Sequence, residues 1–170
     1  MQADAAFIRG STHRVCEDHA CAGVIVGADA HASVAYAIVS DGCSSSPQTD
    51  TGARLLTAAA SALVHQHKLQ VDPAMAYPRA EAACRLLGLP ERCLDATLLV
   101  AIADASSTQI HAFGDGLICA GHTDGSVSAW LLDHDDHPNY LAYAFDPGRN
   151  DPSAKQGTSR RVTRFRMDVV

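Results

Sequence analysis

The feature that most constrains the fold is a near-continuous apolar run at residues 94–103, which reads LDATLLVAIA. It has the length of a strand and lacks the alternation of polar and apolar side chains that marks a strand with one solvated face. A run of this kind predicts a strand buried on both faces. The chain must therefore place packed elements on both sides of the sheet that contains it.

The segments around this run predict strands, then two helices, then a series of strands joined by short turns. Such a series of strands is typical of antiparallel pairing. The order therefore predicts an α+β fold, in which two helices pack on a largely antiparallel sheet or sandwich, within a single domain at residues 1–170. The expected strands are 19–27, 34–40, 94–103, 109–114, 117–121, 126–131, 140–145 and 160–170, and the expected helices are 49–68 and 77–87.

Capping residues support the two helices. Thr49, Asp50 and Thr51 are candidate N-caps for the first helix, because their side-chain oxygens can accept a hydrogen bond from the first turn. Gly88 and Pro90 follow the second helix and are typical of a helix end.

Charge and composition exclude several classes of protein. The 19 acidic residues outnumber the 13 Lys and Arg residues, and the net charge of -6 argues against a nucleic-acid or membrane-surface binder. The first residues have neither a basic segment nor an apolar segment of the kind a secretory signal has, so we expect none. No apolar run approaches the roughly 20 residues of a membrane span. The cysteines are scattered without a CxxC pair, which indicates neither a disulfide framework nor a zinc cluster. We therefore expect a cytoplasmic protein with reduced thiols.

Two acidic pairs flank the first expected hairpin. Glu17 and Asp18 come just before strand 19–27, and Asp41-Gly42 comes just after strand 34–40. Antiparallel pairing places the start of one strand beside the end of the other, so three carboxylates and one backbone carbonyl can meet at one rim of the sheet. Crowded carboxylates repel each other, and a hard divalent cation such as Mg²⁺ or Mn²⁺ relieves this repulsion. The alternative is a capped strand and a simple turn.

Four segments together resemble the metal-dependent Ser/Thr protein phosphatases of the PPM type, also called type 2C. They match the order and separation of the family's acidic motif, its Asp-Gly motif, the helix that follows, its Thr-containing strand and its Gly-Asp turn. The segments are CEDHA at 16–20, AIVSDG at 37–42 with the GAR-led helix from Gly52, DATLLVAIAD at 95–104, and HAFGDG at 111–116.

The resemblance implies a sandwich of two mainly antiparallel sheets flanked by helices. It also implies hydrolysis of phosphoserine and phosphothreonine on a phosphoprotein substrate by a water that two Mg²⁺ or Mn²⁺ ions activate. In this reading Asp41 bridges the two metals, Glu17 and the Gly42 carbonyl hold the second metal, and Asp18 acts through bound water.

The chain departs from the family pattern in three places. Cys43 stands where the family has a His that donates a proton. His13 occupies the position of the family's phosphate-binding Arg, and Arg14 is next to it; we favour Arg14, since it stays charged. After Asp115 nothing resembles the later segments that supply carboxylates to the first metal. We therefore expect the C-terminal part of the family domain to be lacking and the exposed sheet edges to favour self-association.

Other interpretations stay open. A phosphatase-like module could bind metal or a partner without catalysis. Cys43 could be the nucleophile of a cysteine-based phosphatase, but Thr49 occupies the position where that chemistry needs an Arg. The loop at 133–137 could bind zinc through His134, His137 and its aspartates, although such a loop is more often solvated. The segment Gly114-Asp115-Gly116 could be a plain hairpin turn.

Overall fold

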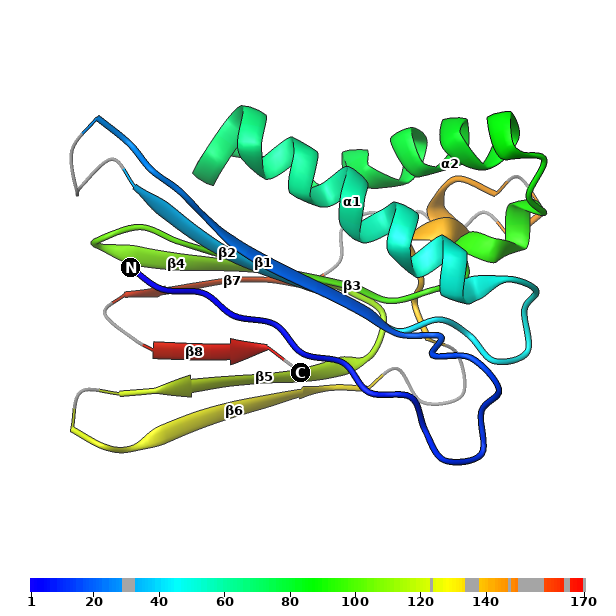
Figure 1. Cartoon of the computed structure of the whole chain (residues 1–170). Helices are drawn as coiled ribbons and strands as arrows, with labels where there is room; N and C mark the ends of the chain where they lie inside the picture. Colours follow the sequence, from blue (N-terminus) through cyan, green and yellow to red (C-terminus); the bar gives the residue numbers. More distant parts are fainter. Residues whose placement is uncertain are drawn as a thin grey trace.

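The strands of the computed structural model form two antiparallel sheets (Figure 1), which confirms the expected α+β class. Helices α1 and α2 lie on the outer side of a five-stranded sheet, and a three-stranded sheet lies on its other side. The structure describes residues 1–28, 33–122, 124–133, 138–146, 148–149, 158–163 and 166–169. None of the helices in these ranges is long and apolar enough to cross a membrane.

The first hairpin pairs as expected. Strand β1 (His19–Ile25) runs antiparallel to β2 (Val34–Ser40), and His19 is the partner of Ser40. This register places the residues before β1 beside those after β2. The two acidic pairs therefore meet at one end of the hairpin, as the sequence predicts.

Strand β3 (Leu98–Ala103) lies between β2 and β4 and is buried on both faces, as expected. Leu98, Val100 and Ile102 belong to the core beneath the helices, whereas Leu99 and Ala101 belong to the core between the two sheets. The first part of the apolar run is not part of the strand. A 3₁₀ helix at Glu91–Leu94 precedes it and turns the chain toward the sheet.

Helices α1 (Thr49–His67) and α2 (Ala76–Leu87) agree closely with the expected ranges. The expected N-cap of α1 is wrong: the capping position is Gln48, which has a left-handed backbone and makes no side-chain cap. The Thr49 hydroxyl instead donates to the Cys43 carbonyl at 3.2 Å. Helix α2 ends at Gly88, whose φ of 66° is the left-handed conformation that glycine adopts readily.

The later strands are divided between the two sheets. They are β4 (Ser107–Phe113), β5 (Gly116–Gly121), β6 (Val127–Leu132), β7 (Thr158–Thr163) and β8 (Arg166–Val169). The five-stranded sheet has the order β1-β2-β3-β4-β7, and the three-stranded sheet has the order β6-β5-β8.

This division corrects two expectations. The turn at Gly114-Asp115-Gly116 is not a hairpin turn, because β4 and β5 lie in different sheets. It carries the chain across the sandwich, with Gly114 at φ 89° packed against Thr97. The expected strand 160–170 is also wrong as a single strand, since β7 pairs with β4 and β8 pairs with β5.

The expected strand at 140–145 is wrong as well. Residues Leu141–Ala144 form a 3₁₀ helix, and Leu141 and Ala142 are buried against the helical side of the core. The ring of Phe145 stacks on Tyr77 of α2 with centroids 4.8 Å apart. The apolar residues here therefore cover the helices rather than extend a sheet. The histidines of the possible zinc loop lie at 134–137, outside the described residues.

Candidate active site

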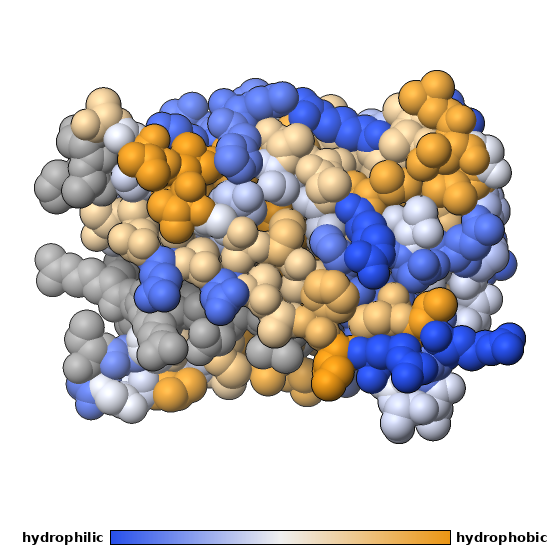
Figure 2. Space-filling model, in the orientation of Figure 1, coloured by the Kyte–Doolittle hydropathy of each residue, from blue (hydrophilic) through white to orange (hydrophobic). Residues whose placement is uncertain are grey.

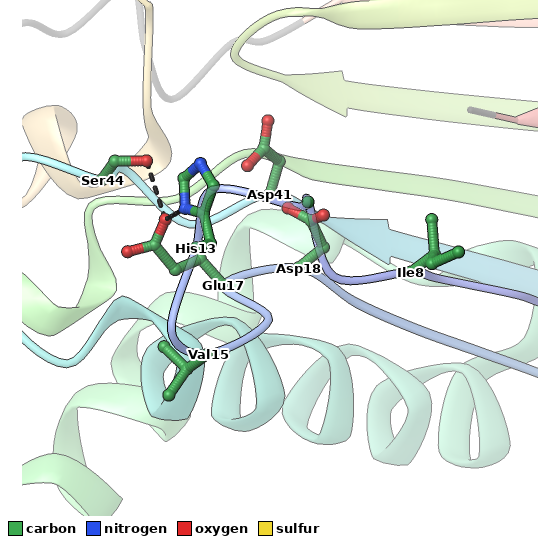
Figure 3. A pocket seen from close by; sticks show the side chains of 8 residues that line it. Ile8, His13, Val15, Glu17, Asp18, Asp41 and Ser44 are labelled. Carbon is green, nitrogen blue, oxygen red and sulfur yellow. Dashed lines mark hydrogen bonds and ion pairs between the residues drawn. The ribbon is translucent and has the colours of Figure 1, made fainter.

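An open pocket of about 340 Å³ lies at the end of the β1–β2 hairpin. The loop before β1 and the residues after β2 form its walls (Figure 3). The pocket therefore brings together the acidic residues that the sequence singled out. Its lining residues are Ile8, Gly10, His13, Val15, Glu17, Asp18, Asp41 and Ser44.

The backbone of Asp41 is fixed by the segment that leads into β3. The Asp41 amide donates to the Thr97 hydroxyl at 2.9 Å, and the Thr97 amide donates to the Asp41 carbonyl at 2.9 Å. The Ser40 hydroxyl donates to the Thr97 carbonyl at 2.7 Å, and Ser40 and Thr97 are both buried. Two hydrogen bonds between the same pair of residues leave Asp41 little freedom, so its carboxyl group is aimed into the pocket by a rigid frame.

Glu17 is held by two neighbours. The Ser44 hydroxyl donates to Glu17 Oε2 at 2.7 Å, and His13 Nδ1 lies 2.9 Å from the same oxygen (Figure 3). Ser44 follows β2 and His13 comes from the loop before β1. Both ends of the hairpin therefore orient this carboxylate.

The three carboxylates affect one another. The Asp41 residue is exposed at the pocket wall, yet its carboxyl group is partly desolvated. This desolvation, a hydrogen bond to Asp18 and the charges of Asp18 and Glu17 together raise the pKa of Asp41 to about 7, and His13 opposes them slightly. The ionised form of Asp41 is therefore disfavoured in this pocket, and a bound cation would relieve the same repulsion.

The chemistry of these residues fits a hard divalent cation. The donors are carboxylate oxygens, which Mg²⁺ and Mn²⁺ prefer, and the crowding that raises the Asp41 pKa is what a cation relieves. The side chains are not yet arranged as ligands: in the described part of the chain no group of three or more His, Cys, Asp or Glu side chains could hold a metal ion as it stands. Binding would need the carboxylates to draw together around the ion.

The remaining expected site residues lie around the pocket. Gly42 is buried and pairs with Ala96. The hydrogen bonds on either side of this pair are made by the Asp41 carbonyl and the Cys43 amide, and the Gly42 carbonyl takes no part in the pairing. A side chain at Gly42 would come within 2.7 Å of the Glu17 carbonyl, so glycine lets the two acidic segments approach. His13 lines the pocket. Arg14 is exposed and is not one of the eight residues that line it.

Cys43 lies directly after the Asp-Gly pair, and its sulfur is 3.1 Å from the Ser45 hydroxyl. Desolvation disfavours the thiolate, but hydrogen bonds from Ser45, Tyr140 and Ser46 outweigh it and hold the pKa of Cys43 below its ordinary value. Burial and the neighbouring Cys43 raise the pKa of Tyr140. The thiol is thus a structural neighbour of the pocket and does not line it.

An ionic network around the buried Asp95 supports the turn that follows Asp41. Asp95 is 1% exposed, and its carboxylate accepts hydrogen bonds from Ser46 at 2.8 Å, Arg92 at 3.2 Å and Arg149 at 2.8 Å. The Asp95 carbonyl accepts from the Cys43 amide at 2.9 Å. This network fixes the turn after Asp41.

Sequence reasoning did not identify Ser44 or the Asp95 network. The run of serines after Asp41-Gly42 is the signal that could have found Ser44. Arg149 reaches Asp95 from 54 positions away, and no local pattern indicates such a contact.

Asp115 lies beside this frame at the turn between the sheets. It follows Gly114, which packs against Thr97, the residue that fixes Asp41. Its Oδ1 atom is buried and has no hydrogen-bond partner among the described residues. Buried carboxylate oxygens are normally satisfied, so this oxygen is available to a further ligand.

A family model for protein phosphatase 2C matches residues 9–147 of the chain. This range includes the acidic residues of the pocket, β3 and the inter-sheet turn. The chain belongs to the protein phosphatase 2C family. None of the curated proteins matches the chain.

Solved structures show the same fold at low sequence identity. RsbX in complex with magnesium is 14% identical and has a TM-score of 0.58, over 92% of this chain and 65% of that one. The catalytic domain of the phosphatase PstP in complex with two manganese ions is 15% identical with a TM-score of 0.54, over 92% and 70%. Stp1 from Staphylococcus aureus is 10% identical with a TM-score of 0.58, over 93% and 68%. The chain thus spans less than two thirds of the RsbX chain that it matches.

Proposed function

We propose that the protein hydrolyses phosphoserine and phosphothreonine on proteins with the help of Mg²⁺ or Mn²⁺. The observation that carries the proposal is the convergence of Glu17, Asp18 and Asp41 on one open pocket in a chain of this family. The likeness to RsbX with magnesium and to PstP with two manganese ions supports the choice of metal.

The residues of the pocket have distinct roles in this proposal. Asp41, Glu17 and the Gly42 carbonyl would hold the metal, and Asp18 would contact it through water. When bound, the metal would lower the pKa of a water molecule and neutralise charge on the phosphoryl oxygens. Thr97 and Ser44 act through other residues: Thr97 fixes the backbone of Asp41, and Ser44 orients Glu17.

The phosphate group would be bound on the His13 side of the pocket. His13 lines the pocket beside Glu17, and Arg14 follows it in the same exposed loop. A protonated His13 and the permanently charged Arg14 would both attract a phosphate dianion. The open pocket suits a phosphorylated side chain that reaches in from a protein surface.

A second candidate function is a phosphatase-like module that binds metal or a partner without catalysis. The observation that favours it is that no metal-ligating group of three or more side chains is preformed in the described residues. In this case the pocket would retain a cation, while the proton donor that Cys43 replaces would be missing.

One experiment separates the two candidates. Mn²⁺ is titrated into the purified chain, and release of phosphate from a phosphoserine peptide and of p-nitrophenol from p-nitrophenyl phosphate is measured. The enzyme hypothesis predicts metal-dependent turnover that falls by about 100-fold or more in Asp41→Asn. The control is Asp124→Asn, which changes an exposed carboxylate of the β5–β6 turn. Mn²⁺ binding without turnover would support the module, and no binding would contradict both.

A further inference from the structure

Two cysteines outside the pocket lie in contact in the core. Cys84 belongs to α2 and Cys93 to the 3₁₀ helix Glu91–Leu94, and their sulfur atoms are 3.2 Å apart. Cys84 is 2% exposed and Cys93 is 0% exposed. A disulfide bond has a sulfur–sulfur distance of about 2.0 Å, so the two atoms need to approach by only about 1 Å.

The backbone around the pair is already folded back on itself. Gly88 ends α2 in a left-handed conformation, and the Leu89 amide donates to the Cys84 carbonyl at 3.0 Å. The Cys93 amide donates to the Pro90 carbonyl at 3.0 Å. These contacts bring the two cysteines together across a short turn, so a bond between them needs only a small displacement of the sulfur atoms.

The segment that carries Cys93 also supports the pocket. Cys93 leads directly to Asp95, whose carbonyl accepts from the Cys43 amide, and to Thr97, which fixes Asp41. Helix α1 packs on the same segment so closely that a side chain at Gly52 would come within 1.7 Å of the Cys93 carbonyl oxygen. A bond at Cys93 would therefore fasten α2 to the frame of the Asp41 site.

We propose that Cys84 and Cys93 form a reversible disulfide that joins α2 to the segment leading into β3. The other four cysteines are partly exposed, so burial distinguishes this pair. The proposal does not depend on the phosphatase activity.

The reaction uses glutathione disulfide as the oxidant. One protein thiolate attacks a sulfur of glutathione disulfide, which forms a mixed disulfide and releases one glutathione thiolate. The second protein thiolate then attacks the protein sulfur of the mixed disulfide and releases the second glutathione. Two electrons and two protons pass from the protein thiols to the two glutathione molecules.

Access of the oxidant controls the rate. Burial raises the pKa of Cys84, and burial together with Cys84 raises the pKa of Cys93 to about 12, so thiolate is scarce in the folded protein. Gly88, Pro90 and Glu91, in the turn between the two cysteines, are all exposed. The bond should form slowly in the folded protein, through local opening of this turn, and quickly when the chain refolds.

The test compares the whole chain in reduced and oxidised glutathione buffers. Folded protein is equilibrated in each buffer, and a second sample is unfolded and refolded in the oxidised one. Free thiols are then alkylated, and the digested protein is mapped by mass spectrometry. We expect a peptide pair linked through Cys84 and Cys93, whose bond is reversed by reduced glutathione. The oxidised protein should melt about 5–10 °C higher than the reduced one.

Single-cysteine variants show which cysteines cause the redox-dependent shift in melting temperature. Cys84→Ala and Cys93→Ala should each abolish the redox-dependent shift in melting temperature, whereas Cys119→Ala on β5 should retain it. The mapping of the unaltered chain decides the question even if a core variant fails to fold. Alkylation of Cys84 and Cys93 as free thiols after refolding in oxidised buffer would overturn the proposal, and so would their linkage to other cysteines.

Discussion

At the scale of the residue, Asp41 is placed where its charge is costly. Its backbone is fixed by Thr97, and its carboxyl group meets Asp18 and Glu17 in the pocket. Three carboxylates this close together lower the stability of the folded protein, because their negative charges repel one another. A bound cation would relieve this repulsion, and without one the crowding makes the protein less stable than it could be.

The first prediction concerns the loss of stability that the ionised Asp41 causes beside Asp18 and Glu17. The pKa of Asp41 is raised from 3.8 to about 7, so Asp41 stabilises the folded protein fully below about pH 4 and loses this effect as the pH rises through about 7. In EDTA at pH 8, Asp41→Asn should raise the free energy of unfolding by up to about 1 kcal/mol, because the exposed side chain is screened. The melting temperature should rise by about 2–4 °C.

The same comparison supplies the control. The gain of Asp41→Asn should shrink as the pH falls and disappear near pH 3, below both the unfolded and the folded pKa, where the unaltered side chain is protonated in both states. A gain that does not depend on pH, or a loss at pH 8, would show that the carboxylates do not repel one another as described.

The second prediction concerns Ser44, which orients Glu17 through a hydrogen bond of 2.7 Å. Ser44→Ala should weaken Mn²⁺ binding by about 10-fold, because the partner of a ligand sets the ligand's direction. Ser45→Ala is the matched control, since Ser45 contacts Cys43 and leaves the bond to Glu17 intact. Calorimetric titration of both variants measures the difference, and equal affinities would remove Ser44 from the site.

At the scale of the element, the contact between α1 and the segment before β3 depends on one glycine. Gly52 lies in the first turns of α1, where a side chain would collide with the backbone at Cys93. This close approach holds Cys93–Thr97 against the helix, and this segment in turn holds Asp41.

The third prediction follows from this contact. Gly52→Ala should destabilise the protein by about 3 kcal/mol, because the added carbon overpacks a rigid backbone contact. Helix propensity alone predicts the opposite sign, about 1 kcal/mol of stabilisation. Ala58→Gly on the exposed side of α1 should cost about 1 kcal/mol through propensity only. Urea unfolding measures both, and a stabilised Gly52→Ala protein would refute the close contact.

The sequence predicts well those elements whose signals are local. The β1–β2 hairpin, both helices and the doubly buried β3 follow from periodicity and from the glycine after α2. The turn at Gly114-Asp115-Gly116 was misjudged, because a tight turn between strands looks the same whether the strands share a sheet or not. Residues 141–144 were misjudged because an apolar run can cover a helix as well as extend a sheet.

The residues of the site also differ in whether local sequence signals predict them. The acidic residues could be found because antiparallel pairing places Glu17, Asp18 and Asp41 at one rim. The Asp95–Arg149 ion pair could not, since it depends on the path of the chain between β6 and β7.

At the scale of the whole molecule, the two sheets leave four edge strands: β1 and β7 on one sheet, β6 and β8 on the other. No further strand pairs with them in the part of the chain that the structure describes. On β6, Val127 and Leu131 are 68% and 73% exposed. Figure 2 shows that the hydrophobic surface on the face in view is divided into separate patches among hydrophilic residues.

The fourth prediction is that the chain self-associates through these edges. Sedimentation velocity should show species larger than the 17.9 kDa monomer as concentration rises, because unpaired strands and apolar side chains favour pairing between copies. Leu131→Lys should shift the distribution toward monomer, and Ser128→Lys on the same strand should do so less. A monomer at all concentrations would contradict the prediction.

We propose that Asp41 organises a site for a divalent cation. Electron paramagnetic resonance tests it directly, because bound Mn²⁺ loses the sharp signal of the free ion. Titration should show that the unaltered chain and Asp124→Asn remove Mn²⁺ from solution and that Asp41→Asn does not. An undiminished Mn²⁺ signal with the unaltered chain, or equal binding by Asp41→Asn, would contradict the claim.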